Sequence, residues 1–430
     1  MDLSLEGNAY INGAFQRCCI GIQQGKIVEI KKMLRAEKHI DVGNRLILPA
    51  GIDLHVHFRD PGFTHKEDFF HGSQAALFGG VSCVCDMPNT KPATTTLSAL
   101  AEKKQIARIK SLVDFGIYAG ITDGNISSVP ELASQCSGFK IYLGGTTNAE
   151  MLSASRLPEV LPSLATSKKL TLIHAELQSC LEQHKKAEAS LSDHVQAHPS
   201  LCEEAALKQI LSLAQNSQAR LHICHLSSSG GVELMKKRPS TMSVGVTPHH
   251  LLFEYENVQT QQTWYKVNPP IRSHQDHEAL WQNMVAGVID VVESDHAPHA
   301  LDEKNQEFNN APSGLPGVET MYPLLLARVK QDRLSFQRLL PLICEKPAGL
   351  LGIPKGKIEV GKDADLLVID FKTMQPITAE NLHSKCGWTP FEGWPALFPE
   401  IVFLRGETAV EDDELLVKQG CGRFIEATHA

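Results

Sequence analysis

The sequence has no apolar run long enough to cross a membrane as a helix, and its N-terminus has no basic segment followed by an apolar stretch. We therefore expect a cytoplasmic protein without a membrane partner. An excess of positive charge is also missing, because 41 Lys and Arg residues stand against 49 Asp and Glu residues. This balance argues against the basic patch that nucleic-acid binding needs. A small-molecule ligand is the better expectation.

Cysteine patterns typical of metal sites are missing as well. None of the eleven cysteines forms a C-x-x-C pair, so we expect reduced thiols rather than a disulfide framework or a cysteine zinc site. The chain has no internal repeat and no low-complexity tract. Its 430 residues, 42% of them hydrophobic, are enough for one large barrel with an accessory domain.

The middle of the chain alternates short apolar runs with helix-like stretches, a pattern typical of a parallel sheet. Eight such runs lie between Gly51 and His299, which is the number that closes a (β/α)8 barrel. An open doubly wound sheet is the alternative. The barrel is favoured because ligand-type residues repeatedly follow the carboxyl ends of these runs, where barrel active sites are built. We predict an α/β fold with a (β/α)8 TIM-type barrel over residues 51–350.

Both ends of the chain have a different character. Residues 1–50 contain short, turn-punctuated segments such as "GIQQGKIVEI", and residues 351–430 return to this pattern in "GKIEVGKDADLLVIDF". We predict that the two flanks pair as one small β-sandwich domain built from both termini.

Two histidines in "IDLHVHFRD" are the strongest local signal of a metal site. Residues two apart on a strand point to the same side, so His55 and His57 can reach one ion. A single pair of this kind can arise by chance in a chain with 19 histidines. Three more ligand-type residues end other apolar runs, namely His174, His225 and Asp295. Their recurrence at strand ends predicts a shared metal site.

Lys140 lies inside the apolar run "GFKIYLGG", where an ammonium loses its hydration unless it is neutralised or paired. A neutral lysine amine can react with carbon dioxide to give a carbamate, an anionic ligand able to bridge two metals. A snorkelling lysine or a salt bridge is the alternative. With each pair of histidines on one ion and Lys140 between them, Asp295 would complete a binuclear hydrolytic site.

Other histidines are expected to lie outside this site. His222 stands at odd spacing from His225 on the same run, so the two side chains should face opposite sides. His249 and His250 end another run, and we expect a structural role for them because adjacent strand residues diverge.

Five motifs, "GIDLHVHFRDPG", "DMPNT", "KVNPPIR", "SDHAPH" and "SGLPGVET", resemble those of dihydroorotases in order and spacing. The resemblance covers nearly the whole chain, up to "SKCGWTPFEGW". It implies that Lys140 is N6-carboxylated and that Asp295 is also the general acid and base. The metal shell that it implies consists of His55, His57, Lys140, His174, His225 and Asp295.

The resemblance also implies substrate contacts. It assigns Arg59, Asn89 and His299 to the substrate carboxylate and Asn268 to the pyrimidine ring. A guanidinium is the natural bidentate partner of a carboxylate. The segment "GGTTN" is similar to the mobile loop that other dihydroorotases close over substrate, which implies roles for Thr146 and Thr147.

The reaction implied by the resemblance is the reversible cyclisation of N-carbamoyl-L-aspartate to L-dihydroorotate, a step of pyrimidine (UMP) biosynthesis. In ring opening, a hydroxide bridging two divalent ions would attack the ring amide, and Asp295 would deliver the proton to the leaving nitrogen. Zinc is the expected metal, with cobalt and manganese as alternatives.

Allantoinases and dihydropyrimidinases are the nearest rival families, because they resemble the chain in fold, histidine pair and bridging lysine. Arg59, Asn89, Asn268 and the "HAPH" segment favour a dihydroorotase. A catalytically silent partner of aspartate carbamoyltransferase would have lost metal ligands, whereas all six are present. A complex of an active enzyme with that carbamoyltransferase, and a homodimer, are left open.

Overall fold

The structure is a computed structural model that describes residues 1–427, and its core is an eight-stranded parallel sheet. Seven of these strands are buried along their whole length and on both faces, as expected for a parallel sheet covered by helices. The strands are β5 (Gly51–Val56), β6 (Val81–Asp86), β7 (Asp114–Ile121), β8 (Gly138–Tyr142), β9 (Leu170–His174), β10 (Arg220–Ile223), β11 (Met242–Val246) and β12 (Val291–Val292).

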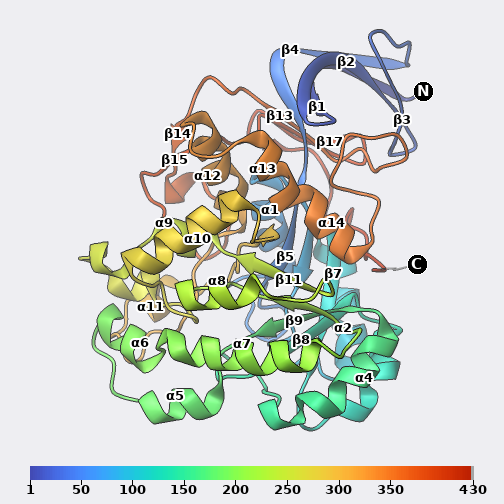
Figure 1. Cartoon of the computed structure of the whole chain (residues 1–430). Helices are drawn as coiled ribbons and strands as arrows, with labels where there is room; N and C mark the ends of the chain where they lie inside the picture. The colour runs from blue at the N-terminus through green and yellow to red at the C-terminus, as the bar shows by residue number, and fades with distance from the viewer. Residues whose placement is uncertain (428–430) are drawn as a thin grey trace.

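Helices follow the strands and surround the sheet (Figure 1). They are α1 (Phe69–Phe78), α2 (Leu97–Lys110), α3 (Val129–Ala133), α4 (Leu157–Ser167), α5 (Gln178–His184), α6 (Leu191–Ala197), α7 (Ser200–Ala214), α8 (Ser229–Met235), α9 (Pro248–Leu252), α10 (His274–Ala286), α11 (Leu301–Lys304), α12 (Val318–Lys330), α13 (Phe336–Leu340) and α14 (Lys346–Leu351). Side-chain caps start several of them, such as Asp68 before α1 and Ser273 before α10.

The sheet closes on itself between its first and last strands. Val56 at the end of β5 bridges His296, and the amide of His57 donates to the carbonyl of His296 at 2.7 Å. The predicted (β/α)8 barrel is therefore confirmed.

A second eight-stranded sheet combines both ends of the chain. Its strands are β1 (Leu3–Ile11), β2 (Ala14–Gln23), β3 (Lys26–Lys31), β4 (Lys38–Pro49), β13 (Leu366–Ile369), β16 (Ile401–Leu404), β17 (Glu407–Glu411) and β18 (Glu414–Leu415). In this sheet β4 lies between β1 and β13, which joins the blue and red parts of the chain in Figure 1. A short pair, β14 (Gln375–Pro376) with β15 (Pro395–Ala396), lies apart from both sheets.

One cysteine expectation is wrong. Cys180 in α5 and Cys202 in α7 form a disulfide with a Cα–Cα distance of 5.3 Å, while the nine other cysteines are free. The two residues are 22 positions apart, and only folding of the segment between them brings α5 beside α7. Such a pair leaves no local pattern in the sequence.

Within residues 1–427, no helix combines the length and the apolar character that crossing a membrane requires.

A buried lysine ties the barrel to the terminal sheet. Lys355 Nζ lies 2.7 Å from Asp114 at the start of β7, and it also pairs with Asp363 and with Asp365 just before β13. Burial disfavours the ammonium, but the three carboxylates outweigh it and raise the pKa of Lys355 above its ordinary value. One side chain therefore pairs with carboxylates of both units, although Asp114 also pairs with Arg405 and Asp363 also pairs with Lys26.

We predict that Lys355→Met lowers the free energy of unfolding by about 3–5 kcal/mol, because it leaves the buried Asp365 without its cationic partner and removes one of the two cations beside Asp114. Chemical denaturation followed by circular dichroism measures the change. Lys357→Met is the matched control, since Lys357 is exposed and pairs only with Glu345. Equal stability of the two variants would contradict this role of Lys355.

Candidate metal and substrate site

The carboxyl ends of the barrel strands gather most of the predicted site residues around one pocket. Lys140 and His299 are the exceptions, because they are fully buried and lie outside the lining. The pocket is lined by His55, His57, Arg59, Asn89, Tyr142, Thr146, Thr147, His174, His225, Val267, Asn268, Asp295, Ala297, Ser313 and Gly314.

The first group of ligand-type atoms forms a triangle. Nε2 of His55 and Nε2 of His57 are 3.2 Å apart, and each lies 3.2 Å from Oδ1 of Asp295. Ligands of a tetrahedral ion, each about 2.0–2.1 Å from it, are about 3.3 Å from one another. The three atoms therefore fit the edges of one metal coordination shell.

The second group is a pair of imidazoles on the neighbouring strands. Nδ1 of His174 lies 3.2 Å from Nε2 of His225. The rings of His225 and His55 have centroids 5.2 Å apart, so the two groups are adjacent. The spacing within this pair again matches two ligands of one ion.

Hydrogen bonds fix which ring nitrogen each histidine presents. Nδ1 of His57 donates to Oδ1 of Asn89 at 2.7 Å, and Nε2 of His174 donates to Oε2 of Glu176 at 3.0 Å. The opposite nitrogen of each ring then carries its lone pair toward the other ligand atoms.

Burial keeps these imidazoles neutral. It lowers the pKa of His55 to about 4, helped by Lys140, and it lowers the pKa of His57 and of His225 well below the usual value. Arg59 adds to the effect on His57, and His174 adds to the effect on His225. Neutral rings are the form that binds metal ions.

Lys140 lies behind the pocket, between the two groups. Its Nζ donates to Sγ of Cys224 at 3.1 Å and lies 5.0 Å from the ring centre of Tyr142. The side chain is fully buried, and its nitrogen forms no ion pair within residues 1–427. A positive charge at this position disfavours the protonated form of the neighbouring imidazoles, and it contributes to the lowered pKa values of His55 and His225. The snorkelling and salt-bridge alternatives for Lys140 therefore do not apply.

Two buried carboxylates that sequence reasoning missed support the ligands from below. Oδ1 of Asp53 accepts the amide protons of His55 at 3.0 Å and of Ser294 at 3.1 Å. Oε1 of Glu293 accepts the amide proton of His225 at 2.8 Å and lies 3.7 Å from Nδ1 of His55. Burial raises the pKa of Asp53 to about 7. These contacts position both groups of ligands.

The expectation for His222 is wrong. Its Nε2 lies 3.3 Å from Oε2 of Glu293, inside the barrel and beneath the site. The backbone leaves the strand after Ile223, and His225 has a φ of 37°, so both histidines face inward despite their odd spacing. Simple alternation along a strand does not describe the last residues of β10.

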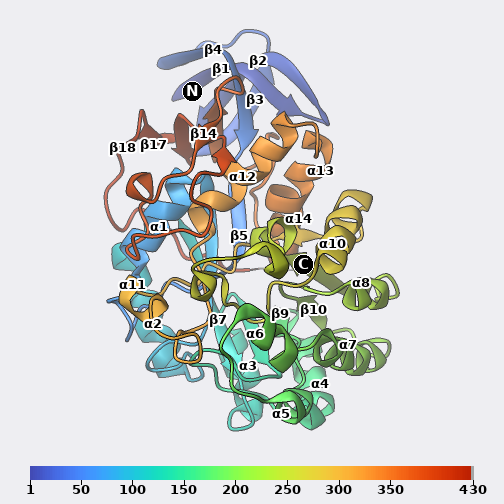
Figure 2. The same cartoon turned by 90° about the vertical axis from the view of Figure 1, so that its left-hand side faces the viewer.

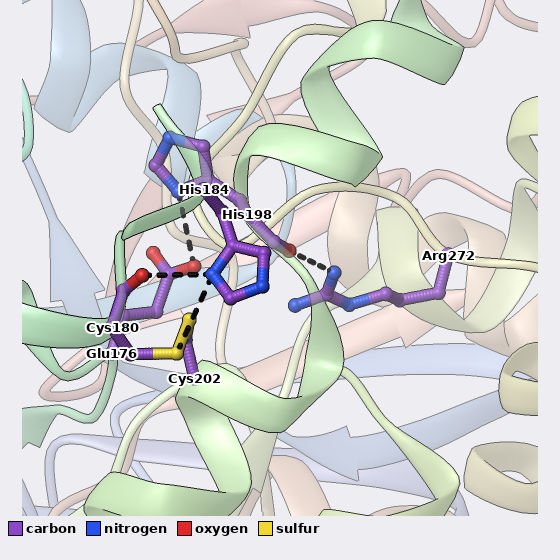
Figure 3. Close-up of a disulfide and its surroundings, with 6 residues drawn as sticks. All are labelled: Glu176, Cys180, His184, His198, Cys202 and Arg272. Atoms are coloured by element: carbon purple, nitrogen blue, oxygen red, sulfur yellow. Dashed lines mark hydrogen bonds and ion pairs between the residues drawn. A yellow bond between two sulfur atoms is a disulfide. The ribbon is translucent and has the colours of Figure 1, made fainter. Parts of the chain in front are cut away.

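Glu176 extends the network to His198, which lies between α6 and α7. Its Oε1 accepts from Nδ1 of His198 at 3.1 Å, and Arg272 donates to the carbonyl of His198 (Figure 3). Burial would raise the pKa of Glu176, but His198 and His174 outweigh it and hold that pKa well below the usual range. A charged carboxylate thus holds His174 in place.

Arg59 offers a buried positive charge to the pocket. Strand β5 ends at Val56, and Arg59 lies in a turn with a φ of 62° rather than on the strand. Its Nε donates to the carbonyl of Pro298 at 3.1 Å, and it forms no ion pair within residues 1–427. Burial lowers its pKa to about 10, so it stays charged at neutral pH. The free face of the guanidinium suits an anion.

His299 lies beneath Arg59 instead of in the pocket wall. Its Nε2 is 3.2 Å from Nη2 of Arg59 and donates to the carbonyl of Ser313, while its Nδ1 accepts from Lys66. Burial and Arg59 lower its pKa well below the usual value. In this arrangement Nε2 carries the ring proton, so His299 packs behind the guanidinium of Arg59 without accepting a hydrogen bond from it.

The remaining predicted contacts line the pocket and bond to each other. Nδ2 of Asn89 donates to the carbonyl of Thr147 at 2.9 Å, and Oγ1 of Thr147 donates to the carbonyl of Ser313 at 3.1 Å. Oδ1 of Asn268 accepts from Oγ of Ser313 at 3.3 Å, and Thr146 lines the same wall. The 144–148 loop therefore closes one side of the pocket.

Tyr142 is a pocket residue that sequence reasoning missed. It stands on β8 two residues after Lys140, is only 3% exposed, and its hydroxyl has no hydrogen-bond partner within the described chain. Its place after Lys140 in "FKIY" is the signal that could have identified it. His250 is structural as expected, because it bonds to Thr247 and to the carbonyl of Pro269.

A family model described as the amidohydrolase family matches residues 46–407. The chain is 39% identical to a dihydroorotase of Methanosarcina acetivorans, over 97% of this chain and 94% of that protein. It is 37% identical to a dihydroorotase of Thermoplasma volcanium, over 99% and 98% of the two chains.

A solved structure of an L-hydantoinase (dihydropyrimidinase) from Arthrobacter aurescens shares the fold. Its TM-score is 0.94 at 29% identity, and the match covers 98% of this chain and 99% of that one. The whole described chain is thus similar to proteins that share one architecture.

We predict that Gly245→Ala destabilises the protein by about 1–3 kcal/mol through overpacking. An added Cβ would lie 2.7 Å from Oε1 of Glu293 and 2.8 Å from Nε2 of His222. Gly349→Ala in α14 is the control, because its Cβ would have no neighbour within 4 Å. Thermal unfolding of the two variants checks this, and an unchanged melting temperature for Gly245→Ala would contradict the tight packing beneath the site.

Proposed function

The chain belongs to the amidohydrolase family, and within it to the dihydroorotases; from that premise we propose that the barrel pocket interconverts L-dihydroorotate and N-carbamoyl-L-aspartate with two bound divalent metal ions. The protein is a hydrolase of cyclic amides. Pyrimidine biosynthesis is the process in which such a reaction serves.

The observation that carries this proposal is the buried guanidinium of Arg59 beside the two ligand groups. Within the described chain it has no carboxylate partner, although it is 2% exposed. A buried charge requires a counter-charge, and both dihydroorotate and carbamoyl aspartate carry a carboxylate. Dihydrouracil and allantoin lack that group. Arg59 therefore favours a dihydroorotase over the hydantoinase and allantoinase alternatives.

The donor atoms support a binuclear metal site. His55, His57 and Asp295 would hold one ion, and His174 and His225 would hold the other. Imidazole nitrogens and carboxylate oxygens suit zinc. When bound, the ions would activate water as the nucleophile and polarise the carbonyl under attack.

Lys140 fits this site as a carbamate. The positive charge of the amine helps to lower the pKa of His55, His57 and His225. Carboxylation would replace that charge with an anion that could contact both ions. The unpaired amine and its full burial support that conversion.

Asp295 is placed to move the proton of the reaction. Its Oδ1 reaches both His55 and His57, and its φ of 47° holds the carboxylate out of strand geometry toward the pocket. In ring opening it would accept a proton from the attacking water and pass it to the ring nitrogen as the amide bond breaks. In cyclisation the same carboxylate would take the proton from the carbamoyl nitrogen.

The substrate carboxylate would bind to Arg59, with His299 packed behind it. Asn268 and the free hydroxyl of Tyr142 offer further polar contacts to the ring. The side-chain oxygen of Asn89 already accepts a hydrogen bond from His57. Asn89 would therefore act on the substrate mainly by orienting His57. The predicted cytoplasmic location, homodimer and carbamoyltransferase complex stay predictions.

We predict that Arg59→Met lowers kcat/KM for dihydroorotate by about 10- to 100-fold, the loss expected for a charged hydrogen bond. Loss of dihydroorotate absorbance measures the rate. Arg156→Met is the control, because Arg156 is half-exposed and pairs with Glu159 on the surface. Turnover of dihydrouracil or allantoin in place of dihydroorotate would support the hydantoinase alternative instead.

A second prediction concerns Lys140. Lys140→Ala should bind fewer than two metal ions per chain and lose activity by at least about 100-fold, since the bridging anion is missing. Added short carboxylic acids should restore part of both in Lys140→Ala but not in Lys140→Met, whose side chain fills the space. Metal analysis and nuclear magnetic resonance with isotopically labelled bicarbonate provide the readouts. Two tightly bound ions in Lys140→Met would contradict the carbamate bridge.

A further inference from the structure

The disulfide between Cys180 and Cys202 closes a segment that borders the pocket. This segment, residues 181–201, includes α6 and joins α5 to α7, and these three helices lie side by side at the lower end of the barrel (Figures 1 and 2). Figure 3 shows the disulfide next to the Glu176 and His198 pair. The mechanism above makes no use of this bond.

The enclosed segment supports one wall of the pocket. Nε2 of His194 donates to the carbonyl of Val267 at 2.9 Å, and Nζ of Lys266 pairs with Glu188 at 3.3 Å. Val267 and Asn268 line the pocket. A change in the order of the segment would therefore reach the wall that faces the substrate.

The residues around Cys180 support the opposite wall. The amide of Leu177 donates to the carbonyl of Cys202 at 3.1 Å. Oε1 of Gln178, the first residue of α5, accepts from the amide of Gly145 at 2.8 Å. Gly145 directly precedes Thr146 and Thr147 of the pocket. The disulfide thus clamps the helix that holds the 144–148 loop.

A third contact reaches a ligand. His198, four residues before Cys202, bonds to Glu176, and Glu176 holds His174. Opening the disulfide would free the ends of the segment, which contacts Val267 and Glu176, and it would loosen α5, whose Gln178 holds Gly145. The state of the disulfide can therefore change the order of the residues that line the pocket.

We propose that Cys180–Cys202 is a reversible thiol–disulfide modification site, opened by a dithiol, whose state sets the order of the 144–148 loop and the affinity for substrate. The consequence for substrate rests on the proposed function, whereas the exchange itself does not.

The exchange would begin at Cys180. Cys180 is 8% exposed as a residue while Cys202 is fully buried, so a thiolate of the reagent attacks Sγ of Cys180 and Cys202 leaves as a thiolate. This step forms a mixed disulfide between the reagent and Cys180. The second thiol of the reagent then attacks the reagent sulfur of that mixed disulfide, and Cys180 leaves. The reagent becomes a disulfide, two electrons pass to the protein, and two protons end on Cys180 and Cys202.

His184 assists the release of Cys180. Its Nδ1 lies 3.9 Å from Sγ of Cys180 and bonds to the carbonyl of the same residue. An imidazole beside a thiol favours the thiolate that must leave or attack. The chain therefore provides both an accessible sulfur and a group that promotes its exchange.

The test compares the metal-loaded, full-length enzyme before and after treatment with dithiothreitol. We expect native reduction to make Cys180 and Cys202 available to alkylation and to speed hydrogen–deuterium exchange at Gly145 and Leu177. The KM for dihydroorotate should rise about five- to tenfold, at the low end of couplings between separate sites, with kcat changed by less than about twofold.

Control variants separate this effect from removal of metal by the reagent. The double variant Cys180→Ser with Cys202→Ser should behave like the reduced enzyme and should not respond to dithiothreitol. Cys421→Ser, which removes a partly exposed free thiol, should respond as the unmodified protein does.

Two results would overturn the proposal. One is a disulfide that dithiothreitol leaves intact in the folded enzyme. The other is a double serine variant whose activity falls on treatment with dithiothreitol as much as that of the unmodified protein does. If dihydroorotate is not turned over in any state, the proposed function fails, and alkylation with deuterium exchange still decides whether the disulfide opens and loosens the loop.

Discussion

The burial of Lys140 at the centre of the barrel is the constraint on which the site depends. Its nitrogen is surrounded by neutral imidazoles and a thiol, with no carboxylate paired to it in the described chain. A protein interior does not hold an ammonium in such surroundings without cost. Conversion to a carbamate, with two cations bound, would turn this repulsive arrangement into an attractive one. The carbamate and the two cations would then hold the strand ends together and also supply the chemistry of the pocket.

A second layer of residues makes this centre possible. Asp53 and Glu293 hold the backbone around the ligands, Glu176 holds His174, and Asn89 holds His57. Each of these contacts selects one ring nitrogen or one backbone orientation. They come from four different strands or strand ends, so the closed barrel is what brings them together. Arg59, with His299 behind it, places a buried positive charge in the wall of the same pocket.

The sequence predicts the barrel well, and it identifies most of the residues that line the pocket, because strands with polar ends recur along the chain. His55, His57, His174, His225 and Asp295 all follow apolar runs, and the structure brings them together. Prediction fails where the chain leaves regular geometry. His222 and His225 both face inward because the backbone turns after β10, and Arg59 lies in a turn of positive φ. The disulfide, Asp53 and Glu293 depend on packing between distant segments, which no local pattern records.

The most direct test of the binuclear centre is a crystal structure of the zinc-loaded protein with anomalous scattering data. Two peaks are expected, one among His55, His57 and Asp295 and one beside His174 and His225. The side chain of Lys140 should continue beyond Nζ as a carbamate that lies between the two peaks. A single peak, or a Lys140 amine that still bonds to Cys224, would contradict the central role given to this lysine.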